Sequence, residues 1–242
     1  MITFIICAYN EEKNILKTLL EVEKACYESS ISNYEIISID DGSTDNTNII
    51  LNNFKNEKNK KINIIKNKKN LGYGASVKIG ANHASKEYIT WIPGDNSHHA
   101  SEISKLLNLL KKYDIISTYY SNSHQRDTFR RYFTSLYTPI LNIIFQKKIP
   151  YYNGVTIIKK KIFLECNIQT NSHAFSLEMW VNIFLSNKYS YIFIPTILSD
   201  RINGASAFRF SNSVKVSYTT LRLFLIYFYR KIFNLFKKKK KI

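Results

Sequence analysis

Polar side chains that could contact a nucleotide follow the first two apolar runs of the sequence. These side chains are Tyr9, Asn10 and Glu11 after the first run, and Asp40 and Asp41 after the second. Carboxylates accept hydrogen bonds from both hydroxyls of a ribose, and such ligands bind at strand ends in α/β sheets. A simpler alternative is that residues 41–43 form a turn before a helix that Asp45 caps.

A glycine-bearing segment, Asn70-Leu71-Gly72-Tyr73-Gly74-Ala75, stands between a predicted strand and a predicted helix. Glycines at this place allow a ligand to approach the backbone, and the helix N–H groups can face an anion. The segment is a weak dinucleotide fingerprint, because Val77 stands where the third glycine of that pattern would be.

Asp95 follows Pro93-Gly94 directly after the fourth apolar run. A carboxylate at a strand end can hold a divalent ion that neutralises a diphosphate, and Mg²⁺ often needs only one or two carboxylates plus phosphate oxygens. Taken alone, Pro-Gly-Asp-Asn would read as an ordinary turn.

The elements that must position these residues alternate along the first half of the chain. Strands are predicted over residues 2–8, 34–39, 61–65, 88–92 and 114–118, with helices over 11–27, 45–54, 74–85 and 101–112. This alternation predicts a mostly parallel sheet with ligands at the carboxyl ends of the strands. The second half is less regular: helices are predicted over 127–145, 175–185 and 213–236, and strands over 151–158 and 189–194.

Composition narrows the class of protein. A chain of 242 residues that is 45% hydrophobic can bury one large core. The three cysteines are scattered without a CxxC pair, so neither a disulfide framework nor a zinc site is expected, and a reducing cytoplasm is the natural compartment. The net charge of +17 favours an anionic partner: nucleic acid, lipid or a phosphorylated small molecule.

The terminal segment favours lipid over nucleic acid. Lys215, Arg222 and Arg230 fall, with Thr219, in one narrow polar stripe of a helix whose other face is apolar. Such a helix is expected to lie in a lipid interface, where the lysines at 237–241 would meet anionic headgroups. Its longest uncharged run is too short to span a bilayer. The alternative is a helix packed on the core, and no nucleic-acid-binding module is recognisable.

Taken in order, these motifs resemble the family 2 glycosyltransferases, and within them the dolichyl-phosphate mannose synthase-like branch. The resemblance covers residues 2–210 and includes two later landmarks, Phe175-Ser176-Leu177-Glu178 and Arg201-Ile202-Asn203-Gly204-Ala205-Ser206. It implies a Rossmann-like GT-A fold, α/β with a mostly parallel central sheet and helices on both faces. We expect residues 1–210 to form the glycosyltransferase domain, and 211–242 the amphipathic membrane-associating helix and lysine tail.

The resemblance also implies roles for the motif residues. Tyr9, Asn10, Glu11, Asp41, Gly72 and Gly74 would bind the nucleotide sugar, and Asp40 would support its strand end. Asp95 would be the second Asp of the family's Asp-X-Asp metal motif, with Ser97 where this branch usually has a metal-holding Gln. Pro93 replaces the first Asp, so weaker or diphosphate-dependent binding of Mg²⁺ or Mn²⁺ is expected.

Candidates for catalysis and acceptor binding lie further along the chain. Arg126, Arg130, Arg131 and above all Arg201 could bind phosphates through the planar guanidinium. Glu178 has three open roles: a general base, a partner for Arg201, or a satisfied buried acid.

The implied activity is inverting transfer from a nucleoside diphosphate sugar to a polyprenyl phosphate or lipid-linked glycan. This would serve polysaccharide or glycoconjugate synthesis by a peripheral protein on the cytoplasmic face of a membrane. The alternative is a non-catalytic sugar-nucleotide-binding module with a degenerate metal site.

Overall fold

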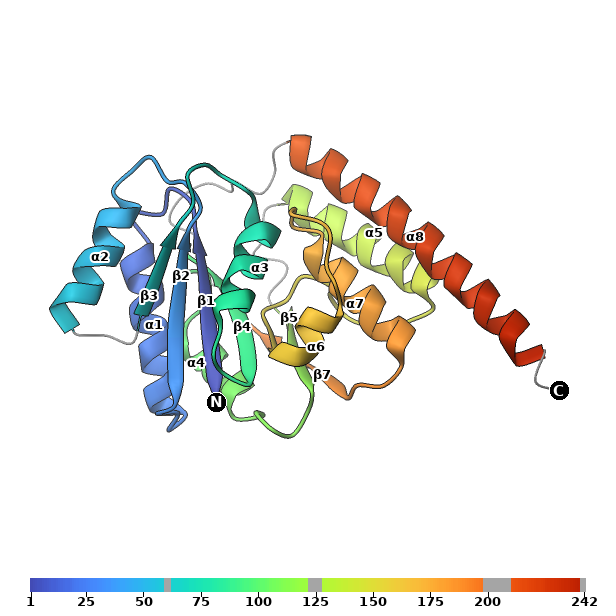
Figure 1. Cartoon of the computed structure of the whole chain (residues 1–242), viewed down its shortest axis with the longest axis horizontal. Helices are drawn as coiled ribbons and strands as arrows, with labels where there is room; N and C mark the ends of the chain where they lie inside the picture. Colours follow the sequence, from blue (N-terminus) through green and yellow to red (C-terminus); the bar gives the residue numbers. More distant parts are fainter. Residues whose placement is uncertain (59–61, 122–127, 198–209, 240–242) are drawn as a thin grey trace.

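The computed structural model describes residues 1–58, 62–121, 128–197 and 210–239 (Figure 1). Within α5 and α8 the side chains of residues 128–134, 210–215 and 231–239 are outside this description. The described chain forms a seven-stranded sheet with helices on both faces, as predicted.

The first half of the chain is a regular alternation of strands and helices. Its strands are β1 (Ile2–Ala8), β2 (Tyr34–Asp40), β3 (Ile62–Lys66) and β4 (Tyr88–Pro93), and its helices are α1 (Ile15–Glu28), α2 (Thr47–Lys58), α3 (Tyr73–His83) and α4 (Ala100–Leu107). All seven residues of β1 are buried, because helices cover both sides of this strand. The predicted order is confirmed, although α4 ends five residues earlier than expected.

The second half contains β5 (Ile115–Tyr120), α5 (Thr128–Phe145), β6 (Thr156–Lys159), α6 (Lys160–Glu165), α7 (Phe175–Ser186), β7 (Tyr191–Thr196) and α8 (Phe210–Lys239). The predicted strand over 151–158 was too long. The carbonyl of Tyr152 accepts a hydrogen bond from the Ser176 hydroxyl of α7 at 2.6 Å, so the start of this stretch is held by a helix. The short helix α6 was not predicted.

The strand order is β3-β2-β1-β4-β6-β5-β7. All neighbouring strands are parallel except β6, which is antiparallel to both β4 and β5. Ala8 stands opposite Asp40, and Cys7 stands opposite Pro93. The carboxyl ends of β2, β1 and β4 therefore lie side by side at one edge of the sheet.

Two hydrophobic clusters lie on opposite faces of the sheet. Alternate side chains of β1 enter each cluster: Phe4 and Ile6 pack in the one that contains α1 and α4, and Ile5 packs in the one that contains α3 and α7 (Figure 1). This period-two division follows from strand geometry, which points successive side chains to opposite faces.

Helix α8 lies beside α5 and α7 (Figure 1). Its inner face carries Thr219, Leu223 and Tyr227, which are 4%, 2% and 7% exposed. The Tyr227 hydroxyl donates a hydrogen bond to the Phe145 carbonyl of α5 at 2.8 Å. Within the described chain, no helix has the length and apolar character needed to cross a membrane.

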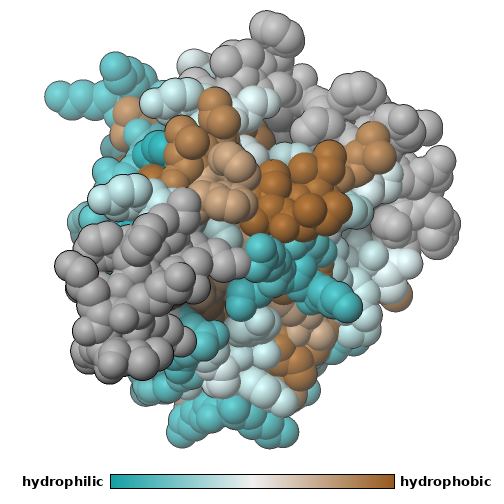
Figure 2. Space-filling view, turned by 90° about the vertical axis from the view of Figure 1, so that its right-hand side faces the viewer, coloured by the Kyte–Doolittle hydropathy of each residue, from teal (hydrophilic) through white to brown (hydrophobic). Residues whose placement is uncertain are grey.

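The outer face of α8 is apolar. Tyr218, Leu221, Leu225 and Tyr229 are between 59% and 72% exposed. Figure 2 looks at the end of the molecule that carries α8 and shows hydrophobic side chains gathered on its surface. The prediction of an exposed polar stripe is therefore wrong for two of its residues. Thr219 is buried in the protein, and Arg222 pairs with a buried carboxylate of α7 at 2.5 Å.

Candidate active site

The polar strand ends lie side by side at one edge of the sheet, as the parallel alternation predicted. Asn10 follows β1, Asp41 follows β2 and Asp95 follows β4, and β1 lies between the other two strands. Neighbouring strands are about 4.8 Å apart, so the ends of β2 and β4 are on the order of 10 Å apart. That separation suits a single ligand of nucleotide size.

Asp41 ties the end of β2 to the glycine-bearing segment. Its Oδ1 accepts hydrogen bonds from the Leu71 N–H at 2.9 Å and from Asn67 Nδ2 at 2.7 Å. Its Oδ2 accepts the Gly72 N–H at 2.9 Å. Asp41 thus shapes the loop before α3. Sequence reasoning missed Asn67, whose only signal was its place directly after the third strand.

The two glycines of this segment pack closely against the backbone of a distant part of the same chain. Gly72 has a φ of 98°, and a Cβ there would lie 2.7 Å from the Asn171 carbonyl oxygen. A Cβ on Gly74 would lie 2.6 Å from the carbonyl oxygen of Ser172, and the Gly74 N–H donates to the Asn171 carbonyl at 3.0 Å. The segment before α7 therefore requires these glycines for close packing, and their contact with a ligand stays a prediction.

The ends of β1 and β2 are joined by side-chain hydrogen bonds. Asn10, at a φ of 56°, accepts the Thr44 N–H at 2.9 Å through Oδ1, and its own N–H donates to the Ser43 hydroxyl at 3.0 Å. The Glu11 N–H donates to the Thr47 hydroxyl at 2.8 Å. Tyr9 is half-buried beside them.

Asp40 supports its strand end, as the sequence suggested. It is fully buried, and its Oδ1 accepts the Ser43 N–H at 2.9 Å. Its Oδ2 has no hydrogen-bond partner among the described residues. A buried acceptor that lacks a donor costs free energy, so a donor group from a ligand or a water molecule would be stabilising at this place.

Asp95 is the candidate metal ligand, and it is 7% exposed. Its Oδ1 accepts hydrogen bonds from the Ser97 N–H at 3.1 Å and from the Ser97 hydroxyl at 2.6 Å. Within the described chain, no three His, Cys, Asp or Glu side chains cluster as a metal-ligand set. Asp95 and Ser97 supply one carboxylate and one hydroxyl, fewer ligands than an all-protein cage needs, and metal binding by them stays a prediction.

A family model described as glycosyl transferase family 2 matches residues 3–175, which include all of these strand ends. The chain belongs to glycosyl transferase family 2. It is thus a glycosyltransferase, and it has the GT-A fold.

This family 2 glycosyltransferase is similar to two curated proteins that match different shares of the chain. It is 28% identical over 196 residues to an uncharacterized protein of Methanocaldococcus jannaschii, covering 76% of this chain and 81% of that protein. It is 33% identical over 119 residues to a dolichyl-phosphate beta-glucosyltransferase of Trichomonas vaginalis, covering 48% of this chain. The match spans 35% of the Trichomonas protein.

Solved structures share the fold at low identity. Glucosyl-3-phosphoglycerate synthase from Mycobacterium tuberculosis, in complex with Mg²⁺ and UDP, superposes with a TM-score of 0.66 at 15% identity, covering 92% of this chain and 79% of that one. TarS from S. aureus in complex with UDP-GlcNAc gives a TM-score of 0.60 at 15% identity, covering 93% and 66%.

Glu178, the candidate base of this glycosyltransferase, is buried in α7, and both of its oxygens are engaged. Arg222 Nη2 donates to Oε1 at 2.5 Å, and the Thr170 N–H donates to Oε2 at 2.9 Å. Of the three roles left open, the satisfied buried acid fits this arrangement, with a partner that was not predicted. Arg126 and Arg201 lie outside the described residues, as do the side chains of Arg130 and Arg131.

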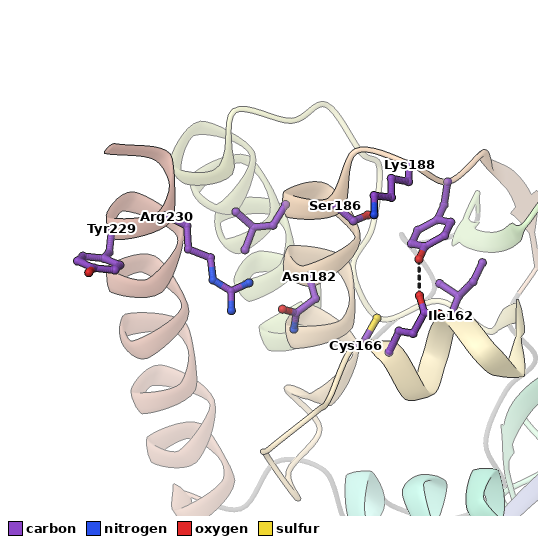
Figure 3. A pocket seen from close by; sticks show the side chains of 10 residues that line it. Ile162, Cys166, Asn182, Ser186, Lys188, Tyr229 and Arg230 are labelled. Atoms are coloured by element: carbon purple, nitrogen blue, oxygen red, sulfur yellow. Dashed lines mark hydrogen bonds between the residues drawn. The ribbon is translucent and has the colours of Figure 1, made fainter. Parts of the chain in front are cut away.

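A pocket of about 400 Å³ opens between α6, α7 and α8 (Figure 3). Arg230 points into it beside Asn182, and the Tyr189 hydroxyl donates to Glu165 at 2.5 Å (Figure 3). That hydrogen bond raises the pKa of Tyr189 to about 12. The pocket is lined by the C-terminal part of α7, whereas the glycine-bearing segment meets the chain just before α7 begins. It is therefore separate from the strand ends.

Proposed function

We propose that this protein transfers a sugar from a nucleoside diphosphate sugar, with inversion, to a polyprenyl phosphate or lipid-linked glycan. The observation that carries the proposal is the placement of Asn10, Asp41 and Asp95 at the ends of three adjacent strands. The structural neighbours crystallised with UDP or UDP-GlcNAc support a nucleotide donor.

The donor would lie across the strand ends. Asn10, Glu11 and the loop held by Asp41 would contact the nucleoside. The diphosphate would lie toward Asp95, and Asp95 with Ser97 would hold Mg²⁺ or Mn²⁺. When bound, such an ion neutralises the charge that develops on the leaving diphosphate.

The buried state of Glu178 favours a phosphate acceptor. Transfer to a sugar hydroxyl requires a general base to take the proton, whereas a phosphate oxygen is already anionic. Because Arg222 and the Thr170 N–H occupy both oxygens of Glu178, this carboxylate is poorly placed to act as that base. The relative named as a dolichyl-phosphate beta-glucosyltransferase also favours a polyprenyl phosphate over a lipid-linked glycan.

The exposed apolar face of α8 supports a peripheral membrane location. Tyr218, Leu221, Leu225 and Tyr229 would enter the lipid interface, and the lysines at 237–241 would meet anionic headgroups. A location on the cytoplasmic face, in polysaccharide or glycoconjugate synthesis, is consistent with that positive charge.

The test is a thermal-shift screen of nucleotide sugars with and without Mn²⁺, followed by a turnover assay with polyprenyl phosphate. We expect one nucleotide sugar to stabilise the protein more strongly with Mn²⁺, and Asp95→Ala to abolish turnover. Binding without turnover of any donor would instead support the non-catalytic module. Stabilisation by no nucleotide sugar would refute the proposal.

A further inference from the structure

An ion pair between a half-buried arginine and a buried carboxylate joins α8 to α7. Arg222 Nη2 donates to Glu178 Oε1 at 2.5 Å, and the two side chains are 30% and 5% exposed. The Nε of Arg222 is buried without a hydrogen-bond partner in the described structure, so Glu178 is the group that holds this guanidinium. The buried carboxylate of Glu178 depends strongly on this partner, because removing Arg222 leaves its charge uncompensated.

Glu178 in turn holds the segment before α7. Its Oε2 accepts the Thr170 N–H at 2.9 Å. The Thr170 hydroxyl lies 3.0 Å from the Ser172 hydroxyl and accepts the Ser172 N–H at 3.3 Å. Thr219 of α8 donates to the same Thr170 oxygen at 3.4 Å. Helix α8 thus makes two contacts here: Thr219 contacts Thr170, and Arg222 contacts the Glu178 carboxylate that holds residues 170–172.

Residues 171 and 172 are the backbone against which the two glycines pack. The Gly74 N–H donates to the Asn171 carbonyl, and Gly72 leaves no room for a Cβ beside that same oxygen. The Leu71 and Gly72 N–H groups donate to the two oxygens of Asp41. A continuous series of contacts therefore runs from Arg222 to Asp41.

We propose that Arg222 is a positioning residue for the nucleotide site. Its ion pair with Glu178 fixes residues 170–172, these residues fix the loop at Gly72 and Gly74, and that loop orients Asp41. Docking of α8 on the protein thereby sets the affinity for the nucleotide. The inference rests on the proposed function, in that it takes the nucleotide to bind beside Asp41.

The test uses the full chain and measures the dissociation constants of UDP and GDP by calorimetry, together with the steady-state constants for the donor. We expect Arg222→Gln to weaken binding of whichever nucleotide the wild type prefers by about tenfold, in the range typical of coupled sites. The donor KM should rise by a similar factor with kcat little changed, and Arg222→Lys should recover part of the loss.

Two further variants separate positioning from general stability. Arg230→Gln removes the same charge from the same helix at a residue that lines the separate pocket, and it should leave nucleotide affinity unchanged. The double variant Arg222→Met with Glu178→Met replaces the ion pair by apolar side chains, which often preserves stability. This double variant should unfold near the wild-type temperature, and its affinity for the nucleotide should remain below that of the wild type.

Wild-type affinity in Arg222→Gln, or in the double variant, would overturn the inference. An equal loss of affinity in Arg230→Gln would also overturn it, because the effect would then follow the charge of the helix and not the ion pair. Failure of the wild type to bind any nucleoside diphosphate would overturn the proposed function, and this inference with it.

Discussion

The carboxylate of Asp41 accepts the backbone N–H of Gly72 at 2.9 Å, although 31 positions of sequence separate the two residues. The other carboxylate oxygen accepts the Leu71 N–H, so both oxygens face backbone donors. The end of β2 and the loop before α3 are therefore one unit, and a change in either should disturb both.

Asp41→Asn should lower stability and weaken nucleotide binding together. The asparagine NH₂ would face a backbone N–H or Asn67 Nδ2, which leaves a donor unpaired at a cost of about 1–3 kcal/mol. Urea unfolding and UDP or GDP titration would measure the two effects. Glu57→Gln, the same chemical change on the exposed surface of α2, should alter neither. Unchanged stability in Asp41→Asn would show that these hydrogen bonds contribute nothing measurable.

Gly72→Ala should destabilise the fold. The new Cβ would lie 2.7 Å from a backbone oxygen at a φ of 98°, a conformation that side chains rarely adopt. Such strain costs of order 1–3 kcal/mol. Leu71→Ala is the matched control: Leu71 is 40% exposed, so this change should stay within about 0.5 kcal/mol. Equal unfolding midpoints in the two variants would count against the packing described for residue 171.

Pro93→Asp should strengthen the metal dependence of donor binding. Pro93 is the last residue of β4 and stands two positions before Asp95, where the family's motif has its first Asp. A second carboxylate raises the charge available to a divalent cation. Thermal shifts with UDP or GDP over a Mn²⁺ series should give a several-fold lower half-saturating concentration. Pro93→Asn controls for loss of the proline ring, and equal curves for the two variants would contradict a metal site at Asp95.

Leu225→Glu should weaken binding to vesicles that contain phosphatidylglycerol without unfolding the protein. Leu225 is 60% exposed on the outer face of α8, so the change removes apolar surface from the proposed lipid contact and leaves the packed face intact. Co-sedimentation with vesicles measures the effect. Leu16→Glu on α1, at a leucine 43% exposed, should sediment like the wild type. Equal sedimentation of all three proteins would show that α8 does not contact the membrane.

The alternation of the strands and the placement of polar residues at their ends followed from local patterns. Apolar runs separated by helical periodicity predict parallel strands, and parallel strands place their carboxyl ends at one edge of the sheet. The sequence alone was therefore enough to place Asn10, Asp41 and Asp95 at one edge of the sheet, and the strand order β2-β1-β4 made them neighbours. Each of these residues comes directly after a buried strand or within two residues of its end.

The partners of Glu178 and the orientation of α8 could not be read in this way. Periodicity gives the angle between residues around a helix, but it does not say which face docks when apolar side chains surround the helix. Arg222 and Thr219 form a polar stripe in the sequence, and the structure turns both toward the protein, where Glu178 and Thr170 are their hydrogen-bond partners. Likewise the sequence determined that residues 72 and 74 are glycines. Only the fold decided that the backbone at residues 171 and 172 packs against them, because that contact joins segments about a hundred residues apart.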